Sequence, residues 1–488
     1  MLGTTIYSFA LIVAVYLLAT WMGSAAYRRA AAPASAPAGT APDLEKQGPG
    51  AARGKVLSLP TLLAALSVFS LFPIAVNDPR LGLWQFGIVA GIFPFSFLLG
   101  YLTPSLIDRY SQGDPNNAGR AYAVNILGCI LGPLLASYLF LPTLGAKGSM
   151  ILMAIPYGLL FAACFSEVKR PLRNAAGAAA GILLASALWI NRSYEERYNQ
   201  CIIRRDSTAT VISMGSGMQR RLLVNGVGIT QLTTITKVMA HLPMLVLKEK
   251  PASALNICFG MGTTYRSLLR WDGLRVTAVE LVPSVKEAFG YYHDDAARVL
   301  SNPLGTIVID DGRRFLRRTS ETFDLVTLDP PPPIEAAGSS LLYAKEFYTL
   351  VKKRLTPSGV VQQWFPGGPG VEFEGIARAL TESFPYVRAY VSMDGWGVHF
   401  LCSMQPFRVP SAEACAARVP KAVREDLLEW EPRRTVTDLF KLTLKQELPI
   451  LEMLERHHDA VAISDDRPIN EYYMIRRAIA HYRRTGHL

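Results

Sequence analysis

Residues 255–280 read LNICFGMGTTYRSLLRWDGLRVTAVE, and this stretch decides the fold of the C-terminal part of the chain. It holds a strand-like run, a turn with Gly260 and Gly262, a helix-like segment and a second strand-like run that ends at Glu280. From 254 to 364 strand-like and helix-like segments continue to alternate. This alternation predicts a parallel sheet wound with helices on both faces, a doubly wound α/β fold.

In such sheets ligands bind beyond the carboxyl ends of the strands, so the residues that follow each strand are the first candidates for a site. Glycines at 260 and 262 let the backbone turn sharply and let a ligand approach closely. Because Tyr265 replaces the third glycine of G-x-G-x-x-G, the motif alone also fits an ordinary strand-to-helix turn. Glu280 stands where a carboxylate would accept hydrogen bonds from a ribose diol; a solvated surface glutamate is the alternative.

Two later strand ends carry aspartates. Asp310 and Asp311 are adjacent, and neighbouring carboxylates repel one another unless a donor faces one of them. An adenine amino group is such a donor and Asp311 is the candidate for it, whereas capping of the next helix is the alternative for one of the pair. Asp329 precedes four prolines, so the chain leaves the sheet stiffly there. The loop that follows either gates a second substrate or is a rigid linker after a helix-capping aspartate.

The first 190 residues have a different character. Apolar runs of membrane-spanning or nearly spanning length occupy residues 5–22, 56–76, 82–104, 120–141, 148–165 and, in a shorter form, 175–190. Basic residues follow the first run instead of preceding it, which favours a membrane anchor over a signal peptide. An Ala/Pro-rich segment then separates this anchor from the remaining runs, and we expect it to be disordered or extended.

After residue 190 the amino-acid composition becomes that of a water-soluble protein. Residues 201–235 alternate β-branched and polar residues around an Asn-Gly pair, which predicts a small antiparallel sheet. We therefore divide the chain into six parts: a first transmembrane helix (1–27), an Ala/Pro-rich linker (28–55), a transmembrane helical bundle (56–190), a small β subdomain (191–235), a nucleotide-binding catalytic domain (236–405) and a C-terminal helical extension (406–488).

The chain is basic, with a formal net charge of +11. Because no Lys/Arg block with interleaved aromatic residues occurs, we do not expect a nucleic-acid partner. Most Lys and Arg residues of the short loops fall on one side of the membrane, against Arg80 and Lys147 on the other, and the basic side is expected to be cytoplasmic. The six cysteines form no Cys-x-x-Cys pair and have no histidine at zinc spacing, so no metal site is expected.

Residues 201–366 resemble the spermidine synthase family of polyamine aminopropyltransferases. The resemblance rests on the glycine turn, the acidic end of the second strand, the Asp-Gly pair and SSLLYAKEFYTLVKKRLTPSGVVQQW at 339–364. The membrane part and SDDRPINEYY at 464–473 are similar to a bacterial subgroup in which a transporter-like helical bundle precedes that domain. The resemblance implies a class I methyltransferase-like (Rossmann-like) sheet preceded by a small antiparallel β-sheet, and a homodimer.

The activity that the resemblance implies is transfer of an aminopropyl group from decarboxylated S-adenosylmethionine, or S-adenosylmethionine itself as a relative, to a small-molecule amine. Asp329 matches the aspartate that orients and deprotonates the attacking amine. The residues assigned to the adenosyl co-substrate are Gly260, Gly262, Glu280, Asp310 and Asp311.

The chain departs from the family on the amine side. Pro332 replaces a second aspartate, and Ile235 and Thr236 replace a tyrosine and a glutamine or histidine. A dicationic diamine needs opposed acidic groups, which argues against putrescine. Glu335 would supply the missing acid if its loop folds back, and Tyr343 is assigned with it to substrate binding. The alternatives are an S-adenosylmethionine-dependent N-methyltransferase, because Asp-Pro-Pro also resembles an amino-methyltransferase motif, and a non-catalytic transport or sensing protein.

The location follows from the co-substrate. If all six apolar runs cross a bacterial inner membrane, the residues after 190 lie outside the cytoplasm. Because adenosyl co-substrates are made inside the cell, we expect a multi-pass inner-membrane protein whose 175–190 run does not cross and whose catalytic domain is cytoplasmic.

Overall fold

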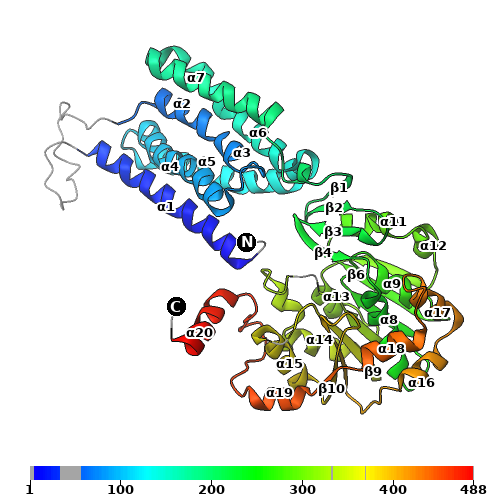
Figure 1. Cartoon of the computed structure of the whole chain (residues 1–488). Coiled ribbons are helices and arrows are strands. Elements are labelled where there is room, and N and C mark those ends of the chain that lie inside the picture. The colour runs from blue at the N-terminus through cyan, green and yellow to red at the C-terminus, as the bar shows by residue number, and fades with distance from the viewer. Residues whose placement is uncertain (1–4, 33–55, 331–332, 369, 487–488) are drawn as a thin grey trace. The chain divides into compact units, whose positions relative to one another are not determined.

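The structure is a computed structural model that describes residues 5–32, 56–330, 333–368 and 370–486. It divides into two compact units, with residues 7–199 in the first and residues 200–488 in the second (Figure 1). The expected Ala/Pro-rich linker lies outside the described residues except for 28–32.

The first unit is helical. Its main helices are α1 (Ile6–Ala31), α2 (Leu59–Phe69), α3 (Phe72–Val76), α4 (Trp84–Ser111), α5 (Pro115–Leu135), α6 (Leu141–Ala163) and α7 (Arg170–Ala185). In the described part of the chain, five helical stretches are long and apolar enough to cross a membrane, which is compatible with a membrane anchor. One of them, Pro115–Ala163, contains two of the expected runs and is kinked at Gly145, where φ is 67° and ψ is 179°.

The last helix of this unit ends beside α6 and the loop between α3 and α4. Lys147 Nζ donates to the carbonyl of Asn191 over 2.6 Å. The carboxylate of Asp78 accepts from Asn191 Nδ2 over 3.2 Å and from Arg80 Nη2 over 2.7 Å. The apolar run at 175–190 is part of a 21-residue stretch, Arg170–Ile190, that is long enough to cross. By length and composition this run can therefore cross, while the expectation that it does not, which rests on the location of the co-substrate, stays a prediction. Residue 191 leaves the bundle at the end that carries Arg80 and Lys147.

The second unit begins with a four-stranded antiparallel sheet in the order β1-β2-β3-β4. Its strands are β1 (Cys201–Arg205), β2 (Thr210–Met214), β3 (Arg221–Val224) and β4 (Val227–Gln231). Asn225 and Gly226 connect β3 to β4 with positive φ values of 51° and 78°, as the sequence predicts for a two-residue hairpin turn.

The main sheet has eight strands in the order β12-β10-β11-β9-β8-β5-β6-β7. They are β5 (Ser253–Ile257), β6 (Arg275–Glu280), β7 (Gly305–Ile309), β8 (Phe323–Leu328), β9 (Leu355–Phe365), β10 (Tyr386–Val391), β11 (Val398–Ser403) and β12 (Glu447–Leu448). The five strands β5, β6, β7, β8 and β9 run parallel to one another. Strand β11 is antiparallel to both β9 and β10. The chain winds outward from β5 to β7 and then returns to β8 on the other side of β5, so the strand order reverses between β5 and β8.

Helices cover both faces of this sheet, because alternate residues of each strand point to opposite sides. Val360 packs in one core with Val238 of α8 (Thr234–Val246), and Val361 packs in the other with Phe347 of α14 (Lys345–Arg354). The first core also takes α9 (Thr263–Leu268), and the second takes α13 (Gly312–Arg318) and α15 (Val371–Ser383). The predicted doubly wound, methyltransferase-like fold after a helical region is confirmed.

The residues after 405 belong to the same compact unit. They supply β12 and the helices α16 (Ala412–Arg418), α17 (Lys421–Leu428), α18 (Val436–Leu444), α19 (Ile450–Arg456) and α20 (Tyr473–Thr485). The fully buried Lys237 of α8 donates to Glu429 and to the carbonyl of Asp426, both over 2.5 Å. Trp271 Nε1 donates to His241 Nδ1, so the other ring nitrogen of His241 carries the proton that is donated to the Asp426 carboxylate over 2.9 Å. This buried polar cluster fixes α17 to α8.

Candidate active site

The glycine turn and the end of β6 form one hydrogen-bonded structure. Glu280 is 8% exposed, and its Oε2 accepts from the backbone N–H groups of Phe259 over 3.0 Å and Gly260 over 3.3 Å. Its Oε1 accepts from Val282 N over 3.0 Å. Burial raises the pKa of Glu280, and the backbone N–H groups oppose that shift. The structure therefore places the predicted Glu280 against the turn that contains the predicted glycines.

Gly262 cannot be replaced by a larger residue without strain. Its φ is 76°, in the left-handed region, and a Cβ there would lie 2.5 Å from the ring of Phe289 and 2.6 Å from the ring of Phe259. Gly260 is also left-handed, with φ of 56°, but has more space around it. The conformation and the close packing together keep the backbone of the turn at the carboxyl end of β5.

The two adjacent aspartates after β7 both have donors. Asp311 is the N-cap of α13 and accepts from Arg314 N over 2.8 Å through Oδ1. Asp310 accepts from the Arg314 guanidinium and, over 2.7 Å, from the N–H of Asp311. Helix capping, the structural alternative for this pair, is therefore what Asp311 does. Within the described residues, Oδ2 of Asp311 has no hydrogen-bond donor, so it can accept a second bond from a ligand.

Asp329 is at the end of β8, where its N–H bonds the carbonyl of Ile257 over 3.3 Å. Burial raises the pKa of Asp329 to about 7. Its charge is among the causes that raise the pKa values of Cys258 and Tyr343 after burial itself, so the three side chains are close neighbours. Among the described residues nothing donates a hydrogen bond to the Asp329 carboxylate. A carboxyl group with a pKa near neutrality and no fixed partner can take and release protons at physiological pH.

Sheet register identifies residues near Asp329 that sequence reasoning missed. Leu328 pairs with Gln363, so Asp329 and Trp364 follow as the next positions on adjacent parallel strands, and His399 lies opposite Trp364 on β11. The rings of Trp364 and His399 are 4.8 Å apart. On the other side is Cys258, which has an unusual φ of 72° for a non-glycine residue. Only the strand pairing, which a single sequence does not contain, brings these residues into one row.

The two residues assigned to the amine have different surroundings. Tyr343 is fully buried, and its hydroxyl has no hydrogen-bond partner among the described residues. Burial, followed by the charge of Asp329, raises its pKa well above the ordinary value for tyrosine. Glu335 is partly exposed in the loop that links β8 to α14. Pro332, which stands in place of the family's second aspartate, lies outside the described residues.

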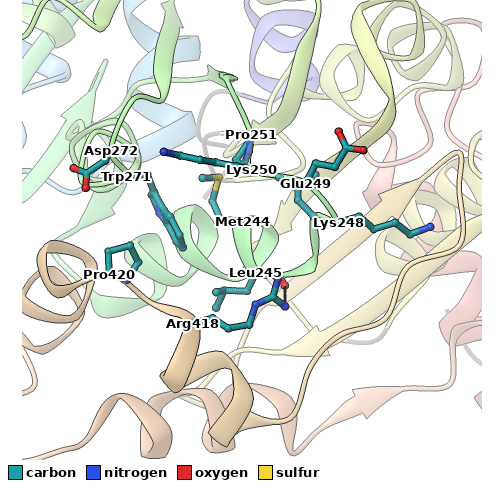
Figure 2. Close-up of a pocket in the computed structure, with 11 residues that line it drawn as sticks. Met244, Leu245, Lys248, Glu249, Lys250, Pro251, Trp271, Asp272, Arg418 and Pro420 are labelled. Atoms are coloured by element: carbon teal, nitrogen blue, oxygen red, sulfur yellow. Dashed lines mark hydrogen bonds between the residues drawn. The ribbon is translucent and has the colours of Figure 1, made fainter.

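Two pockets of this unit are formed by other residues. One, of about 350 Å³, is formed by Leu245, Lys248 and Lys250 with Trp271 and Arg418, and Arg418 donates to the carbonyl of Leu245 over 3.1 Å (Figure 2). This pocket adjoins the amino ends of β5 and β6, which is the opposite edge of the sheet from the glycine turn.

The other pocket, of about 440 Å³, has His293 and Trp430 in its wall. Neither pocket is lined by Glu280 or Asp329. The candidate site is therefore defined by the strand ends and not by these two pockets.

Comparisons with known proteins show which family the chain resembles. Residues 233–390 match the model of the spermine/spermidine synthase domain. The chain is 36% identical over 163 residues to the polyamine aminopropyltransferase of Sulfurisphaera tokodaii, covering 32% of this chain and 54% of that protein. It is 30% identical over 246 residues to polyamine aminopropyltransferase 2 of Hyperthermus butylicus, covering 46% of this chain and 75% of that protein.

These matches are partial. The chain spans about half the length of the first two relatives, at 54% each. A solved spermidine synthase from Thermotoga maritima is similar with a TM-score of 0.38 and 20% identity, covering 47% of this chain and 88% of that one.

Proposed function

Because the chain belongs to the spermine/spermidine synthase family, we propose that it is a membrane-anchored transferase that moves the aminopropyl group of decarboxylated S-adenosylmethionine to a small amine. One observation carries the proposal. Glu280 with its glycine turn and the unpartnered Asp329 lie at the ends of β6 and β8, the two strands that flank β5 where the strand order reverses.

The donor fits the groups on the β6 and β7 side of the site. The Glu280 carboxylate, already held in place by three backbone N–H groups, has lone pairs left for ribose hydroxyls. The second oxygen of Asp311 would accept from an amino group of adenine. Gly260 and Gly262 leave the backbone of the turn without side chains, so the methionine-derived part of the donor can approach it.

Asp329 would act on the amine. An ammonium ion has no free lone pair, so it must lose a proton before it can attack, and the carboxylate of Asp329 is the base that takes this proton. The neutral nitrogen then attacks the methylene carbon bonded to the sulfonium. A C–N bond forms as the C–S bond breaks, the electron pair stays on sulfur as a neutral thioether, and the product leaves as a secondary ammonium ion. A base with a pKa near 7 takes and releases the proton at physiological pH.

Calorimetric titration of the detergent-purified full chain tests the donor. We expect tighter binding of decarboxylated S-adenosylmethionine than of S-adenosylmethionine, and a large loss of affinity in Asp311→Ala. Tighter binding of the carboxylated form would favour N-methyl transfer instead. If neither compound binds, the proposed transferase activity is wrong.

Turnover tests the role of Asp329. Asp329→Asn should abolish transfer and keep the dissociation constant of the donor within a few-fold, because the change removes the base and leaves the adenosyl contacts intact. Unchanged turnover in this variant would remove Asp329 from the mechanism.

The proposal places the catalytic unit in the cytoplasm, where the donor is made. The loop charges oppose this location, because residue 191 leaves the bundle beside Arg80 and Lys147 and most other basic loop residues belong to the opposite end. A reporter fused after residue 488 decides between a cytoplasmic and a periplasmic catalytic unit. Activity of a cytoplasm-specific reporter supports the proposed donor, and activity of a periplasm-specific reporter would exclude a donor drawn directly from the cytoplasmic pool.

A further inference from the structure

A short segment near the C-terminus, residues 463–471, contacts both the adenine side and the amine side of the proposed site. It contains SDDRPINE, part of the stretch at 464–473 on which the resemblance to the membrane-fused subgroup rests. In the fold it follows α19 and precedes α20. We call residues 463–471 the brace.

On the adenine side the brace bonds the first turn of α13. The Asp465 carboxylate accepts two parallel hydrogen bonds from Arg313, Nη1 to Oδ1 over 2.8 Å and Nη2 to Oδ2 over 2.9 Å. Arg313 is 8% exposed and lies two residues after Asp311. Such a bidentate pair sets the direction of the arginine as well as its distance. It therefore fixes the start of α13, which Asp311 caps.

On the amine side the brace bonds the loop between β8 and α14. Asn470 Nδ2 donates to the carbonyl of Ile334 over 2.6 Å and to Ser339 Oγ over 2.9 Å. Glu471 Oε1 accepts from both the N–H and the hydroxyl of Ser340. Asn470 is fully buried and Glu471 is 7% exposed.

This loop depends on the brace for its position. The backbone polar groups of a segment outside helices and sheets must find other partners when they are buried. Asn470 and Glu471 supply such partners at Ile334 and Ser340, on both sides of Glu335.

The brace is itself fixed by packing on α15. Ile463 N bonds the carbonyl of Gly375 over 3.2 Å. A Cβ at Gly375 would lie 2.5 Å from Cδ1 of Ile469 and 3.2 Å from the carbonyl oxygen of Val461, so a larger residue would push the brace away from the helix or force Ile469 to move. Ile463 and Ile469 belong to the same core as Ile334. Because α15 holds the brace in place, the brace can in turn hold the segments that it contacts in place.

We propose that the brace positions the two halves of the site separately: Asp465 positions the adenine side through Arg313, and Asn470 and Glu471 position the amine-side loop. The identity of the two ligands rests on the proposed function, but the two sets of contacts do not. Asp465, Asn470 and Glu471 are positioning residues, because they touch neither ligand in this arrangement and act through Arg313, Ile334 and Ser340.

Two isosteric substitutions in the detergent-purified full chain separate the halves. Asp465→Asn should raise the dissociation constant of decarboxylated S-adenosylmethionine roughly 10-fold, because it removes the charge from a bidentate pair. Asn470→Asp puts a carboxylate oxygen against the carbonyl of Ile334 and should speed amide hydrogen exchange in residues 333–343 at least roughly 10-fold. Each variant should leave the other measurement within about 2-fold.

The matched control is Asp466→Asn, which changes the same kind of charge on an exposed neighbour and should alter neither measurement. Glu471→Gln keeps an oxygen that accepts both bonds from Ser340 but removes its charge, so it should increase exchange in the same residues less than Asn470→Asp does. If Asn470→Asp does not fold, Ser340→Ala removes one bond to Glu471 and should give a smaller increase in exchange of the same peptide.

Equal effects of Asp465→Asn and Asn470→Asp on both measurements, or no effect on either, would overturn the proposal, because the brace would then be only part of the core or of no consequence. If the wild type binds no decarboxylated S-adenosylmethionine, the proposed donor fails while the hydrogen-exchange comparison still tests the amine-side contacts.

Discussion

Replacing Asp329 by asparagine should make the protein more stable at alkaline pH even though it abolishes the proposed reaction. Burial raises the pKa of Asp329 from an ordinary value of 3.8 to about 7. Between these values the folded chain keeps the carboxyl proton and the unfolded chain has lost it. The free energy of unfolding therefore falls as pH rises, by about 1.4 kcal/mol per pH unit, and stays low above pH 7.

The expected magnitude follows from this interval. Over roughly three pH units the wild type loses about 4 kcal/mol of stability that Asp329→Asn does not lose, because an amide resembles the protonated carboxyl and does not ionise. For a unit of this size we expect a melting temperature above that of the wild type by roughly 5–10 °C at pH 8. The two proteins should melt within about 2 °C of each other at pH 4.

Thermal unfolding of wild type and Asp329→Asn in the same detergent, at pH 4, 6 and 8, measures the difference. Asp310→Asn is a matched control, because Asp310 is paired with Arg314 and its loss should not stabilise the chain at any of these pH values. A difference between Asp329→Asn and wild type that does not grow with pH would refute the conclusion that Asp329 is a partly buried carboxyl group with no partner among the described residues.

Three further substitutions test the site and its support. Glu280→Gln should weaken donor binding roughly 10- to 100-fold by calorimetry, since a neutral amide accepts fewer and weaker hydrogen bonds from the turn and the ribose; unchanged affinity would remove Glu280 from the site. Gly262→Ala should destabilise the chain by about 2–4 kcal/mol in denaturant unfolding. Gly217→Ala, at φ of 53° but in open space, should cost only about 1–2 kcal/mol, so equal losses would contradict the clash with Phe289. Asp426→Ala removes the buried carboxylate that accepts from His241, Ser267 and Arg266, leaves Glu429 as the one carboxylate paired with Lys237 in this cluster, and should lower stability by about 3–5 kcal/mol; a loss below about 1 kcal/mol would show that the cluster is dispensable.

Much of the candidate site could be predicted because its signals are local. A strand followed by glycines, or by a carboxylate, places those residues at the carboxyl edge of a parallel sheet whatever the rest of the chain does. For this reason Gly260 and Glu280 are found in contact, Gly262 lies in the same turn, and Asp329 lies at the end of β8, beside β5. Their roles in binding and catalysis stay predictions.

The contacts of the brace could not be predicted, because they join residues far apart in the sequence. Arg313 and Asp465 are 152 positions apart, and Ile334 and Asn470 are 136 apart. The charges of the SDDRP motif indicate an ion-paired turn, but nothing local says which arginine pairs with which aspartate. The helical stretch around the apolar run at 175–190 is longer than the run itself, because a helix does not begin where apolar residues begin, and this one starts at Arg170.

The contrast among the aspartates of one protein is the strongest argument that Asp329 serves chemistry and not folding. Burial alone would raise the pKa of Asp426, yet hydrogen bonds from His241 and Ser267 and the charge of Lys237 hold it below its ordinary value. Asp310 and Asp465 are each paired with an arginine. Asp329 has no such partner among the described residues, and its pKa is raised, so it lowers stability at neutral pH. A carboxylate that served only the structure would be paired with a basic residue, as these other aspartates are. An unpaired carboxyl group fits a residue that must exchange a proton with its ligand.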